Sequence, residues 1–401
     1  MKRNLALVFI SMILLAGCFM YVPQGDYGSP APSPAPAPTP APETQFDNQW
    51  NYDNPDMSDY YGYLGSSGYW VSYPSYGYVW LPRDIGYGWR PYSLGRWVRT
   101  EFGWTWISVE RWGWLVYHYG RWGWDVRLGW FWVPGTEWAP AWVAWRWGDA
   151  YIGWAPLPPG NEFVRGFGFR RREFNLPGDS WCFVRGQEFL DPRLDRWILP
   201  RERNVNIINY TRMDVNISVR DNRIINNGVD VDFVQRQANR AVQSYQLRDA
   251  RRPNEAQVGS RDVALYRPNV RSNQSARPKE VLQPDQAAVR RAEGAPVPTR
   301  YTGGSVQNDE TAVRQEHAQE TQRLENDQKA EMRALQQKAA AERAALRNSA
   351  ERQKADAAAQ AKIAQVKKNH DAEKAQMAQR HRVEEEQVRK NRLKRNEPEK
   401  H

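Results

Sequence analysis

Three acidic side chains in a tryptophan-rich stretch are the residues with which this chain could catalyse a reaction. Glu101, Glu110 and Asp125 are carboxylates, and two carboxylates at a suitable separation can hydrolyse a glycosidic bond. Each one also lies where the local sequence predicts a turn, which explains an acidic side chain without catalysis. We therefore predict no catalytic residue and no enzymatic activity. Glycan hydrolysis that disappears in Glu101→Gln or Asp125→Asn variants would contradict this prediction.

The histidines and cysteines form no metal-ligand pattern. Four of the five histidines lie at or beyond position 317, which leaves His118 alone in the region expected to fold. Without a second histidine or a nearby cysteine, we expect no metal and no cofactor, and we interpret His118 as one more aromatic side chain. Cys182 lies between Trp181 and Phe183, and we expect it to be a buried apolar side chain rather than a reactive thiol.

Tryptophan has the clearest spacing in the chain. Three similar tetrapeptides recur every 26 residues, and 17 of the 20 tryptophans lie within residues 70–154. A regular period predicts one small supersecondary unit repeated in series. Because side chains alternate along a strand, Trp104 and Trp106 must share one face of a strand, and Trp130 and Trp132 must do the same.

Two roles for these indole rings stay open. Aliphatic side chains are sparse here, so the rings must supply most of the core packing, stacked offset or edge to face. A domain of about 90 residues cannot bury its whole surface, and an exposed aromatic patch usually marks a binding surface. The candidate ligand-binding residues are two tryptophan pairs and two neighbouring arginines, namely Trp104, Trp106, Trp130, Trp132, Arg96 and Arg121.

Arginine replaces lysine through most of the chain. No lysine occurs between residues 4 and 278, whereas residues 329–400 contain many. Because guanidinium groups stack on aromatic rings, we expect the arginines of the tryptophan-rich region to be structural cation–π partners. The formal net charge of +10 permits nucleic-acid binding, but a secreted chain rarely meets that ligand, so we expect no nucleic-acid partner.

The first 18 residues have the layout of a secretory signal. Lys2 and Arg3 precede an apolar run of eleven residues, which is too short to span a bilayer. Residues 15–18, Leu-Ala-Gly-Cys, begin with the last residue of that run and resemble the bacterial lipobox, and the resemblance implies that Cys18 is lipidated and becomes the mature N-terminus. Two or more acyl chains anchor a protein stably. Phe19 after the cysteine resembles lipoproteins sent to the outer membrane; the alternative is a secreted protein cut near Gly17.

Composition divides the rest of the chain. Aromatic and β-branched runs that flank glycine-containing turns predict antiparallel hairpins. The expected regions are a signal peptide (1–17), a lipidated N-terminus with a Pro/Ala-rich linker (18–68), a Trp-rich β-hairpin repeat domain (69–160), a second β-rich element with a short helix (161–252), a disordered linker (253–308), a long charged helix or coiled coil (309–396) and a tail (397–401).

Several motifs resemble a known family. They include Gly-Trp-Thr-Trp (103–106), Tyr-His-Tyr-Gly-Arg-Trp (117–122) and Trp-Ala-Pro-Ala-Trp-Val-Ala-Trp-Arg-Trp (138–147). These motifs are similar to an uncharacterised Trp/Tyr-rich domain family of bacterial envelope proteins, some of which also carry FecR-type domains. The resemblance covers about residues 69–234. Because that family has no assigned activity, the resemblance implies a location but no functional residue.

Residues 309–396 contain neither glycine nor proline and are rich in Ala, Glu, Lys, Arg and Gln. This composition is typical of a long helix or coiled coil. If continuous, these 88 residues would extend roughly 130 Å at about 1.5 Å per residue. We expect a weakly self-associating coiled coil, with a solitary charged helix as the alternative.

The sequence thus predicts a multidomain, mainly β protein with a smaller β element and a long C-terminal helix. The expected function is that of a non-enzymatic lipoprotein in the bacterial cell envelope, held on the membrane by its lipid. Tryptophan faces flanked by arginine suit stacking on sugar rings, so cell-wall peptidoglycan or exopolysaccharide glycan is the expected ligand class. The alternative is a structural protein whose repeats and coiled coil mediate protein contacts within an assembly.

Overall fold

The fold is described from a computed structural model, which describes residues 50–83, 85, 89–160, 163–164, 168–169, 174, 176–294 and 306–396. The predicted signal peptide, Cys18 and the Pro/Ala repeat lie outside the described residues, as does the predicted 397–401 tail. No helix in the described ranges has the length and apolar character needed to cross a membrane.

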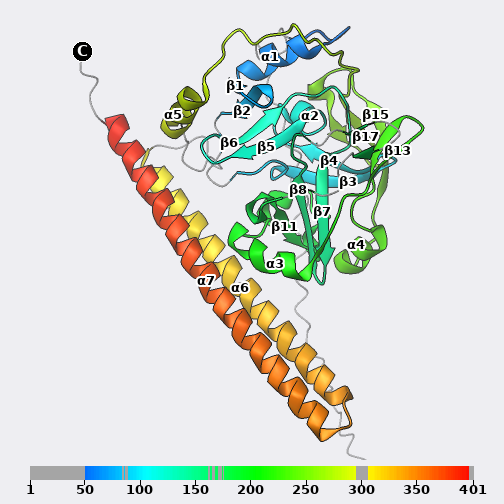
Figure 1. Ribbon diagram of the computed structural model, residues 1–401, viewed down its shortest axis with the longest axis vertical. Helices are drawn as coiled ribbons and strands as arrows, with labels where there is room; N and C mark the ends of the chain where they lie inside the picture. The colour runs from blue at the N-terminus through cyan, green and yellow to red at the C-terminus, as the bar shows by residue number, and fades with distance from the viewer. Residues whose placement is uncertain are drawn as a thin grey trace, which may run out of the picture. The chain divides into compact units, whose positions relative to one another are not determined.

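Four consecutive β-hairpins form the tryptophan-rich region (Figure 1). They are β1–β2 (Gly68–Tyr73 and Gly77–Pro82), β3–β4 (Gly95–Thr100 and Gly103–Ser108), β5–β6 (Arg121–Asp125 and Gly129–Val133) and β7–β8 (Val143–Gly148 and Tyr151–Pro156). The short helix α2 (Gly113–Val116) lies between the second hairpin and the third. The predicted antiparallel hairpins are therefore confirmed.

Each hairpin pairs at least one tryptophan directly with another across its two strands. The pairs are Trp70 with Trp80, Trp97 with Trp106, Trp122 with Trp132, Trp124 with Trp130, and Trp145 with Trp154. Directly opposed side chains lie on the same face of a sheet, so each hairpin presents an indole pair on one side. Strands β2 and β6 also meet at Trp80 and Trp132, which extends two of the pairs into one row of four indoles. This pairing is the structural basis of the 26-residue period.

Glycine makes room for these rings. A Cβ atom on Gly95 would lie 2.7 Å from the Trp106 ring, and one on Gly120 would lie 2.8 Å from the Trp132 ring. Both glycines also have positive φ angles, of 156° and 66°. Other residues rarely adopt such angles, so both space and backbone conformation require glycine here.

The four hairpins do not form one continuous sheet. They are distributed over three sheets with the strand orders β1-β2-β6-β5, β11-β8-β7-β12 and β13-β14-β4-β3-β15-β17-β16. The added strands are β11 (Cys182–Arg185), β12 (Arg212–Asp214), β13 (Ile217–Arg220), β14 (Arg223–Asn226), β15 (Ser244–Asp249), β16 (Gln257–Val258) and β17 (Asp262–Leu265), and β9 (Phe163–Val164) pairs with β10 (Gly168–Phe169). Later segments thus complete the sheets that the repeats begin.

Indole rings fill the core, as their number and the scarcity of aliphatic residues predicted. All 20 tryptophans are described, and 16 of them are buried. Many of their ring N–H groups donate to backbone carbonyls: Trp80 Nε1 donates to Leu64 O at 2.9 Å, and Trp132 Nε1 donates to Tyr119 O at 2.8 Å. A buried donor without an acceptor costs free energy, so these bonds stabilise the orientation of the rings that make them, whereas Nε1 of Trp97 and of Trp106 has no hydrogen-bond partner among the described residues.

The last part of the expected N-terminal linker belongs to the folded region. Helix α1 (Met57–Gly65) begins with a capping box formed by Asp56 and Asp59, and it buries Tyr60. Trp50 is 5% exposed and donates from Nε1 to the Tyr266 hydroxyl at 2.8 Å. The linker prediction is therefore wrong from residue 50 onward, because aromatic side chains spaced along a polar segment anchor it to the core.

The region 161–252 contains more helix than expected. Helices α3 (Asn204–Tyr210) and α4 (Val231–Ala238) accompany the short strands, and the described 3₁₀ helices are η2 (Gly178–Ser180), η3 (Gly186–Glu188), η4 (Leu194–Arg196), η5 (Arg201–Arg203) and η6 (Pro253–Glu255). The tight turn between β13 and β14 is made by Asp221 and Asn222, both with positive φ.

Residues 253–294 are packed, which corrects the prediction of a disordered linker. Strand β17 buries Val263 completely, and helix α5 (Pro284–Gly294) buries Ala287. Between them the chain runs along β1, where Leu282 N donates to Trp70 O at 2.9 Å and Leu282 O accepts from Ser72 N at 3.0 Å. A few apolar anchors thus hold a segment whose overall composition is polar.

The C-terminal region is a helical hairpin rather than one rod. Helices α6 (Val306–Ala345) and α7 (Ser349–Asn396) run antiparallel to each other (Figure 1). Contacts such as Gln328 with Glu373 and Arg343 with Asp356 join the two helices. Residues 346–348 separate them, and Asn348 caps α7, since its Oδ1 accepts from Ala350 N at 2.8 Å. The helix is therefore not continuous over residues 309–396, and the span calculated for one continuous helix does not apply.

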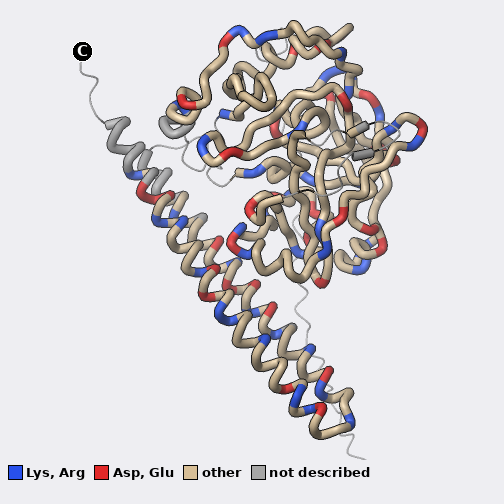
Figure 2. The backbone as a smooth tube through the Cα atoms, in the orientation of Figure 1, with Lys and Arg blue, Asp and Glu red and all other residues tan. Residues whose placement is uncertain are grey.

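Charged side chains connect this helical hairpin to η5. The Arg203 side chain is 1% exposed, pairs with Glu331, and lies 3.6 Å from Asp327 and 3.8 Å from Glu373. The neighbouring Glu202 accepts from Arg380 Nε at 2.9 Å. Charges of both signs are frequent along α6 and α7 (Figure 2).

Candidate functional site

The four tryptophans proposed as ligand-binding residues lie in the core. Trp104, Trp106 and Trp132 are 0% exposed and Trp130 is 8% exposed. In this arrangement none of the four presents a ring face on which a ligand could stack, so the structure does not support that role for them. The rings face inward because each hairpin turns its tryptophan pair toward the core. The two tryptophans classed as exposed are Trp124, at 54%, and Trp197, at 42%.

The two candidate arginines are partly buried rather than arranged around a ligand. Arg121 lies 3.4 Å from the centre of the Trp142 ring and donates from Nη1 to Gly120 O at 2.7 Å. Burial lowers the pKa of Arg121 to about 9 and also lowers the pKa of Arg96. Arg99 and Arg146 likewise lie over the Trp104 and Trp181 rings. The predicted structural cation–π role is thus confirmed for Arg99, Arg121 and Arg146.

Two of the three candidate carboxylates bind backbone amides. Asp125 Oδ1 accepts from Arg127 N at 2.8 Å and from Leu128 N at 3.0 Å, which closes the β5–β6 turn. Glu101 lies in the turn between β3 and β4, and its Oε2 accepts from Leu247 N of β15 at 2.9 Å, which connects the turn to that strand. These bonds give both side chains a structural role, and the positions of Glu101 and Asp125 confirm the turn interpretation.

Glu110 has a different environment. Its carboxylate accepts from Trp89 Nε1 at 2.9 Å and from Ser108 Oγ at 3.1 Å, and it also bonds to the Tyr117 hydroxyl. Burial raises the pKa of Glu110 to about 7, although these three hydrogen bonds lower it. Burial therefore favours the protonated form of Glu110 in the folded protein.

His118 is an aromatic core residue, as predicted. It is 2% exposed, its ring stacks on Trp138 with centroids 5.5 Å apart, and Nδ1 lies 2.9 Å from Ala139 O. Burial lowers its pKa to about 4, so the ring is neutral at physiological pH. Among the described residues, no group of His, Cys, Asp and Glu is arranged to hold a metal ion.

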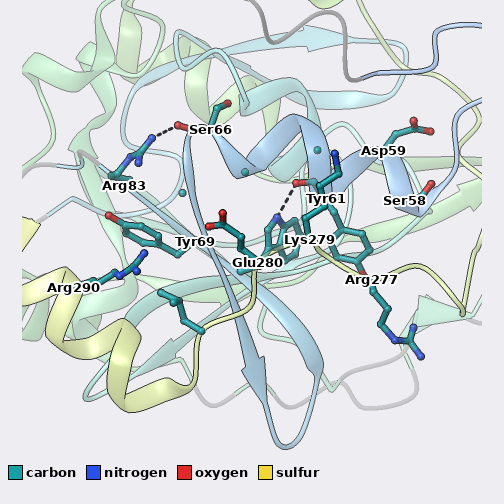
Figure 3. Close-up of a pocket in the computed structure, with 15 residues that line it drawn as sticks. Ser58, Asp59, Tyr61, Ser66, Tyr69, Arg83, Arg277, Lys279, Glu280 and Arg290 are labelled. Atoms are coloured by element: carbon teal, nitrogen blue, oxygen red, sulfur yellow. Dashed lines mark hydrogen bonds between the residues drawn. The ribbon is translucent and has the colours of Figure 1, made fainter.

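A groove beside α1 brings aromatic and charged side chains to the surface (Figure 3). Its volume is about 780 Å³. We call it the α1–β1 groove; it is lined by Ser58, Asp59, Tyr61, Gly62, Gly65, Ser66, Gly68, Tyr69, Trp70, Arg83, Arg277, Lys279, Glu280, Leu282 and Arg290. One wall comes from α1, β1 and Arg83 after β2, and the other comes from the segment before α5 and from Arg290 in α5.

Aromatic rings form part of the groove lining. Tyr69 is half-buried on β1, so part of its ring is open to solvent. Tyr61 packs edge-on against Trp70, with centroids 4.6 Å apart, and Trp70 Nε1 donates to Tyr61 O at 3.2 Å. These contacts fix the position of Tyr61 and Trp70.

Basic side chains outnumber acidic ones in the groove. The Arg83 guanidinium lies 5.7 Å from the Tyr69 ring centre and the Arg290 guanidinium lies 5.8 Å from it. Figure 3 shows these two groups on opposite sides of Tyr69, with Glu280 between Tyr69 and Tyr61. With Arg277 and Lys279 the lining holds four basic groups, against the two acidic groups Asp59 and Glu280.

The sequence did not reveal this groove, because both of its walls fall partly in segments that were expected to be linkers. Lys279, Glu280 and Arg290 belong to the expected disordered region, and Tyr61 to the expected N-terminal linker. The available signal was the run Tyr60-Tyr61-Gly62-Tyr63, since three tyrosines in four residues are unusual for a linker.

Comparison with known proteins gives one partial match. Residues 61–161 match the model of a family of unknown function, DUF6600. Neither the curated proteins nor the solved structures contain a match to this chain. The match covers the four tryptophan hairpins and the groove residues from Tyr61 to Arg83, while Ser58, Asp59 and the groove residues from Arg277 to Arg290 lie outside it. Residues 61–161 are therefore similar to a family whose function is unknown.

Proposed function

We propose that this chain is a non-enzymatic lipoprotein of the bacterial cell envelope that binds a glycan in the α1–β1 groove. The observation that carries the binding proposal is the half-buried Tyr69 ring in a groove lined by charged side chains. The sequence resemblance to envelope proteins and the lipobox-like segment support the location.

The groove has the chemistry that a sugar ring requires. Binding pockets usually combine apolar or aromatic walls with a few polar groups that orient the ligand, and their volumes are roughly 300–1,000 Å³. A sugar ring has a face of C–H groups, which packs on an aromatic ring, and hydroxyl groups around its edge. Tyr69 offers the ring, Arg83 and Arg290 offer donors, and Glu280 offers an acceptor.

The binding proposal is tested with the full chain carrying Cys18→Ser, which removes the expected lipid. We expect this protein to be retained on purified peptidoglycan or on exopolysaccharide. Gly65 lines the groove, and a Cβ atom there meets no other atom within 4 Å, so Gly65→Trp occupies groove volume without disturbing the fold. Retention that survives this substitution, with circular dichroism unchanged, would contradict binding in the groove.

The anchor is tested separately. Lipid on Cys18 would hold the chain at a membrane, and Phe19 in the next position favours the outer membrane. The Pro/Ala repeat of residues 30–42 would extend by about 3.1 Å per residue and so act as a spacer. We expect labelled fatty acid to enter the wild-type protein but not the Cys18→Ser variant, which should leave the membrane fraction. Equal labelling of both proteins would contradict the anchor.

The second candidate is an assembly protein whose helical hairpin binds other proteins or another copy of this chain. The observation that favours it is the length of α6 and α7, which have 40 and 48 residues. Buried apolar side chains such as Leu324 and Met377 already serve the contact between the two helices. Self-association as a coiled coil would therefore require exchange of helices between copies. A monomer in analytical ultracentrifugation across a wide concentration range would exclude self-assembly through this hairpin.

A further inference from the structure

We infer that the connected end of the helical hairpin binds an anionic polysaccharide through the basic side chains of α6 and α7. We call this end, residues 333–368, the basic end. It is a second binding surface, and it does not depend on the α1–β1 groove. The choice of a polysaccharide among polyanions rests on the proposed location in the cell envelope.

The two helices carry their charge unevenly. The basic end has nine basic and three acidic side chains, which give a formal net charge of +6. The remaining residues of the helices, 306–332 and 369–396, have 11 basic and 12 acidic side chains. Arg343 of α6 pairs with Asp356 of α7, so the two helices lie side by side at this end, and basic residues lie on both of them (Figure 2). The positive charge is therefore concentrated at one end of the hairpin.

The basic side chains of this end are accessible. All nine are exposed, and they are Arg333, Lys338, Arg343, Arg347, Arg352, Lys354, Lys362, Lys367 and Lys368. Among the described residues, the pair of Arg343 with Asp356 is the one ion pair that any of them makes, and its side chains are 60% and 43% exposed. Exposed pairs of this kind are weak, so the charge of the basic end is available to a partner.

The rest of the hairpin uses its charges within the fold. Arg380 lies 2.9 Å from Glu202, 2.8 Å from Glu320 and 3.0 Å from Glu384. Asp327, Glu331 and Glu373 surround Arg203 of η5. In the described part of the chain, no hydrogen bond or ion pair joins residues 333–368 to the β strands or to η5. The two ends of the hairpin therefore differ: one is held by paired charges, and the other presents unbalanced ones.

The arrangement of the basic side chains favours a flexible partner over a flat one. Arg333, Lys338 and Arg343 follow one another at intervals of five residues, so each points about 140° around the helix from the last. A bilayer surface would meet only one side of such a helix. None of the large apolar side chains classed as exposed lies within the basic end, so it offers no apolar face for insertion into lipid.

The chemistry of the basic end matches a polymer with repeated anionic groups. Guanidinium groups bind carboxylates and phosphates through two parallel N–H donors, and lysine adds compact positive charges. The basic end contains no aromatic residue, so it lacks the rings on which the bases of single-stranded nucleic acid stack. Duplex DNA needs no such rings, but the expected secretory signal directs the chain away from it. A polysaccharide that carries carboxylate or phosphate groups fits both the charge and the proposed location.

Charged and uncharged forms of the same polymers test the inference. Polygalacturonate is compared with its carboxyl-reduced form, and dextran phosphate is compared with dextran, which separates the two anionic groups. Binding is measured by affinity electrophoresis with the full chain carrying Cys18→Ser. We expect at least one charged polymer to bind and its uncharged form not to bind. Because ion contacts release counterions, we expect the affinity to fall by about tenfold or more between roughly 50 and 200 mM NaCl.

Two matched variants locate the site. The first carries Lys338→Gln, Arg347→Gln, Lys354→Gln and Lys362→Gln in the basic end, and we expect it to bind the charged polymer about tenfold or more weakly, with a smaller dependence on salt. The control loses the same charge at exposed positions elsewhere on the two helices, through Arg314→Gln, Lys329→Gln, Lys374→Gln and Arg382→Gln. Glutamine, lysine and arginine have similar helix propensities, so the helical circular dichroism should be unchanged in both variants. Equal weakening in the two would overturn the assignment to the basic end.

The other outcomes separate this inference from the proposed glycan groove. Binding of the charged polymer that persists in Gly65→Trp supports a site outside the groove, whereas its loss in that variant would overturn the site on the helices. Failure of all charged polymers to bind would overturn the inference and leave retention on peptidoglycan as a separate test of the groove. Tighter binding of duplex DNA or of phosphatidylglycerol vesicles, lost in the basic-end variant, would overturn the choice of a polysaccharide.

Discussion

The tryptophan hairpins and the α6–α7 helical hairpin bury their side chains in different ways. In the β-hairpins, Trp122 and Trp132 face each other across two strands and are 2% and 0% exposed. Between the helices, several buried groups are ionisable: His317 Nε2 lies 2.7 Å from Glu384 Oε2, and both residues are buried. The first contact depends on shape and apolar area, and the second depends on charge.

The comparison explains how the chain uses its basic residues. In the tryptophan-rich region arginine lies over aromatic rings, as Arg121 does over Trp142. In the helical hairpin basic side chains pair with carboxylates, as Arg380 does with Glu320 and Glu384. Loss of one indole should therefore affect the whole β region, whereas loss of one charge should affect mainly the helical hairpin. The following predictions test that difference.

The largest effect is expected for Trp132→Ala. This change removes a fully buried indole from the row of four rings and leaves a cavity, so we expect the free energy of unfolding to fall by about 4 kcal/mol. Urea denaturation followed by circular dichroism measures the effect. Trp124→Ala in the same hairpin is the control, because that ring is 54% exposed and its loss should cost less than about 0.5 kcal/mol. Similar losses for both variants would contradict the assignment of Trp132 to the core.

A smaller and local effect is expected for Arg203→Met. The change leaves Asp327, Glu331 and Glu373 without their buried basic partner, which typically costs about 3 kcal/mol or more. We expect faster hydrogen exchange in η5 and in the facing turns of α6 and α7, with unchanged exchange in β5 and β6. Arg343→Met is the control: its pair with Asp356 is 60% and 43% exposed, so its loss should cost below about 1 kcal/mol.

Glu110 provides a charge test inside the aromatic region. Burial raises its pKa to about 7, above its value in the unfolded chain. Its stabilising effect is therefore greatest at acidic pH and falls as the pH rises through 7. Because Glu110 accepts from Trp89 Nε1, we expect tryptophan fluorescence to change with a midpoint near pH 7. Glu110→Gln should abolish this transition and should make stability depend less on pH between 5 and 8.

The smallest effect is expected from titration of His317. Both of its ring nitrogens face carboxylates, at 2.7 Å from Glu384 and 3.2 Å from Glu385. Burial acts to lower the pKa of His317, but these hydrogen bonds outweigh it and raise the pKa. The protonated ring therefore stabilises the helical hairpin at acidic pH, and that stabilisation is lost as the pH rises through the raised pKa. The protection factors of the α6 amides, which exclude the intrinsic acceleration of exchange with pH, should fall as the pH rises above the ordinary histidine pKa of 6.5, and His317→Gln should reduce that fall.

Local patterns predicted the repeated hairpins, and they did so for a physical reason. The period of two along a strand places Trp104 and Trp106 on one face, and glycine-containing turns separate the strands. The sheet assignments could not be predicted in this way, because they depend on partners far apart in sequence, such as β4 with β14. The sequence also did not show that the proposed ligand-binding rings are buried. Alternation places side chains on one face of a strand but does not indicate whether that face packs against the core or lies in solvent.

The structure of the polar segments was harder to predict from the sequence than that of the hairpins. Composition indicated disorder for residues 253–308, but Val263 and Ala287 anchor the described part, and neither changes the average composition noticeably. The end of α6 was also missed, since no glycine or proline marks it and Asn348 is the cap. The groove could not be predicted either, because both of its walls lie partly in segments that were expected to be linkers.

The contact between Gly120 and the Trp132 ring also bears on how freely this sequence can evolve. Gly120, which has no side chain, packs against tryptophan, which has the largest. Even alanine at position 120 would bring a methyl group within 3 Å of the indole. Mutational tolerance is therefore expected to be lowest at positions that have no side chain at all. A deep mutational scan should show the repeat glycines to be as intolerant of substitution as the tryptophans they face.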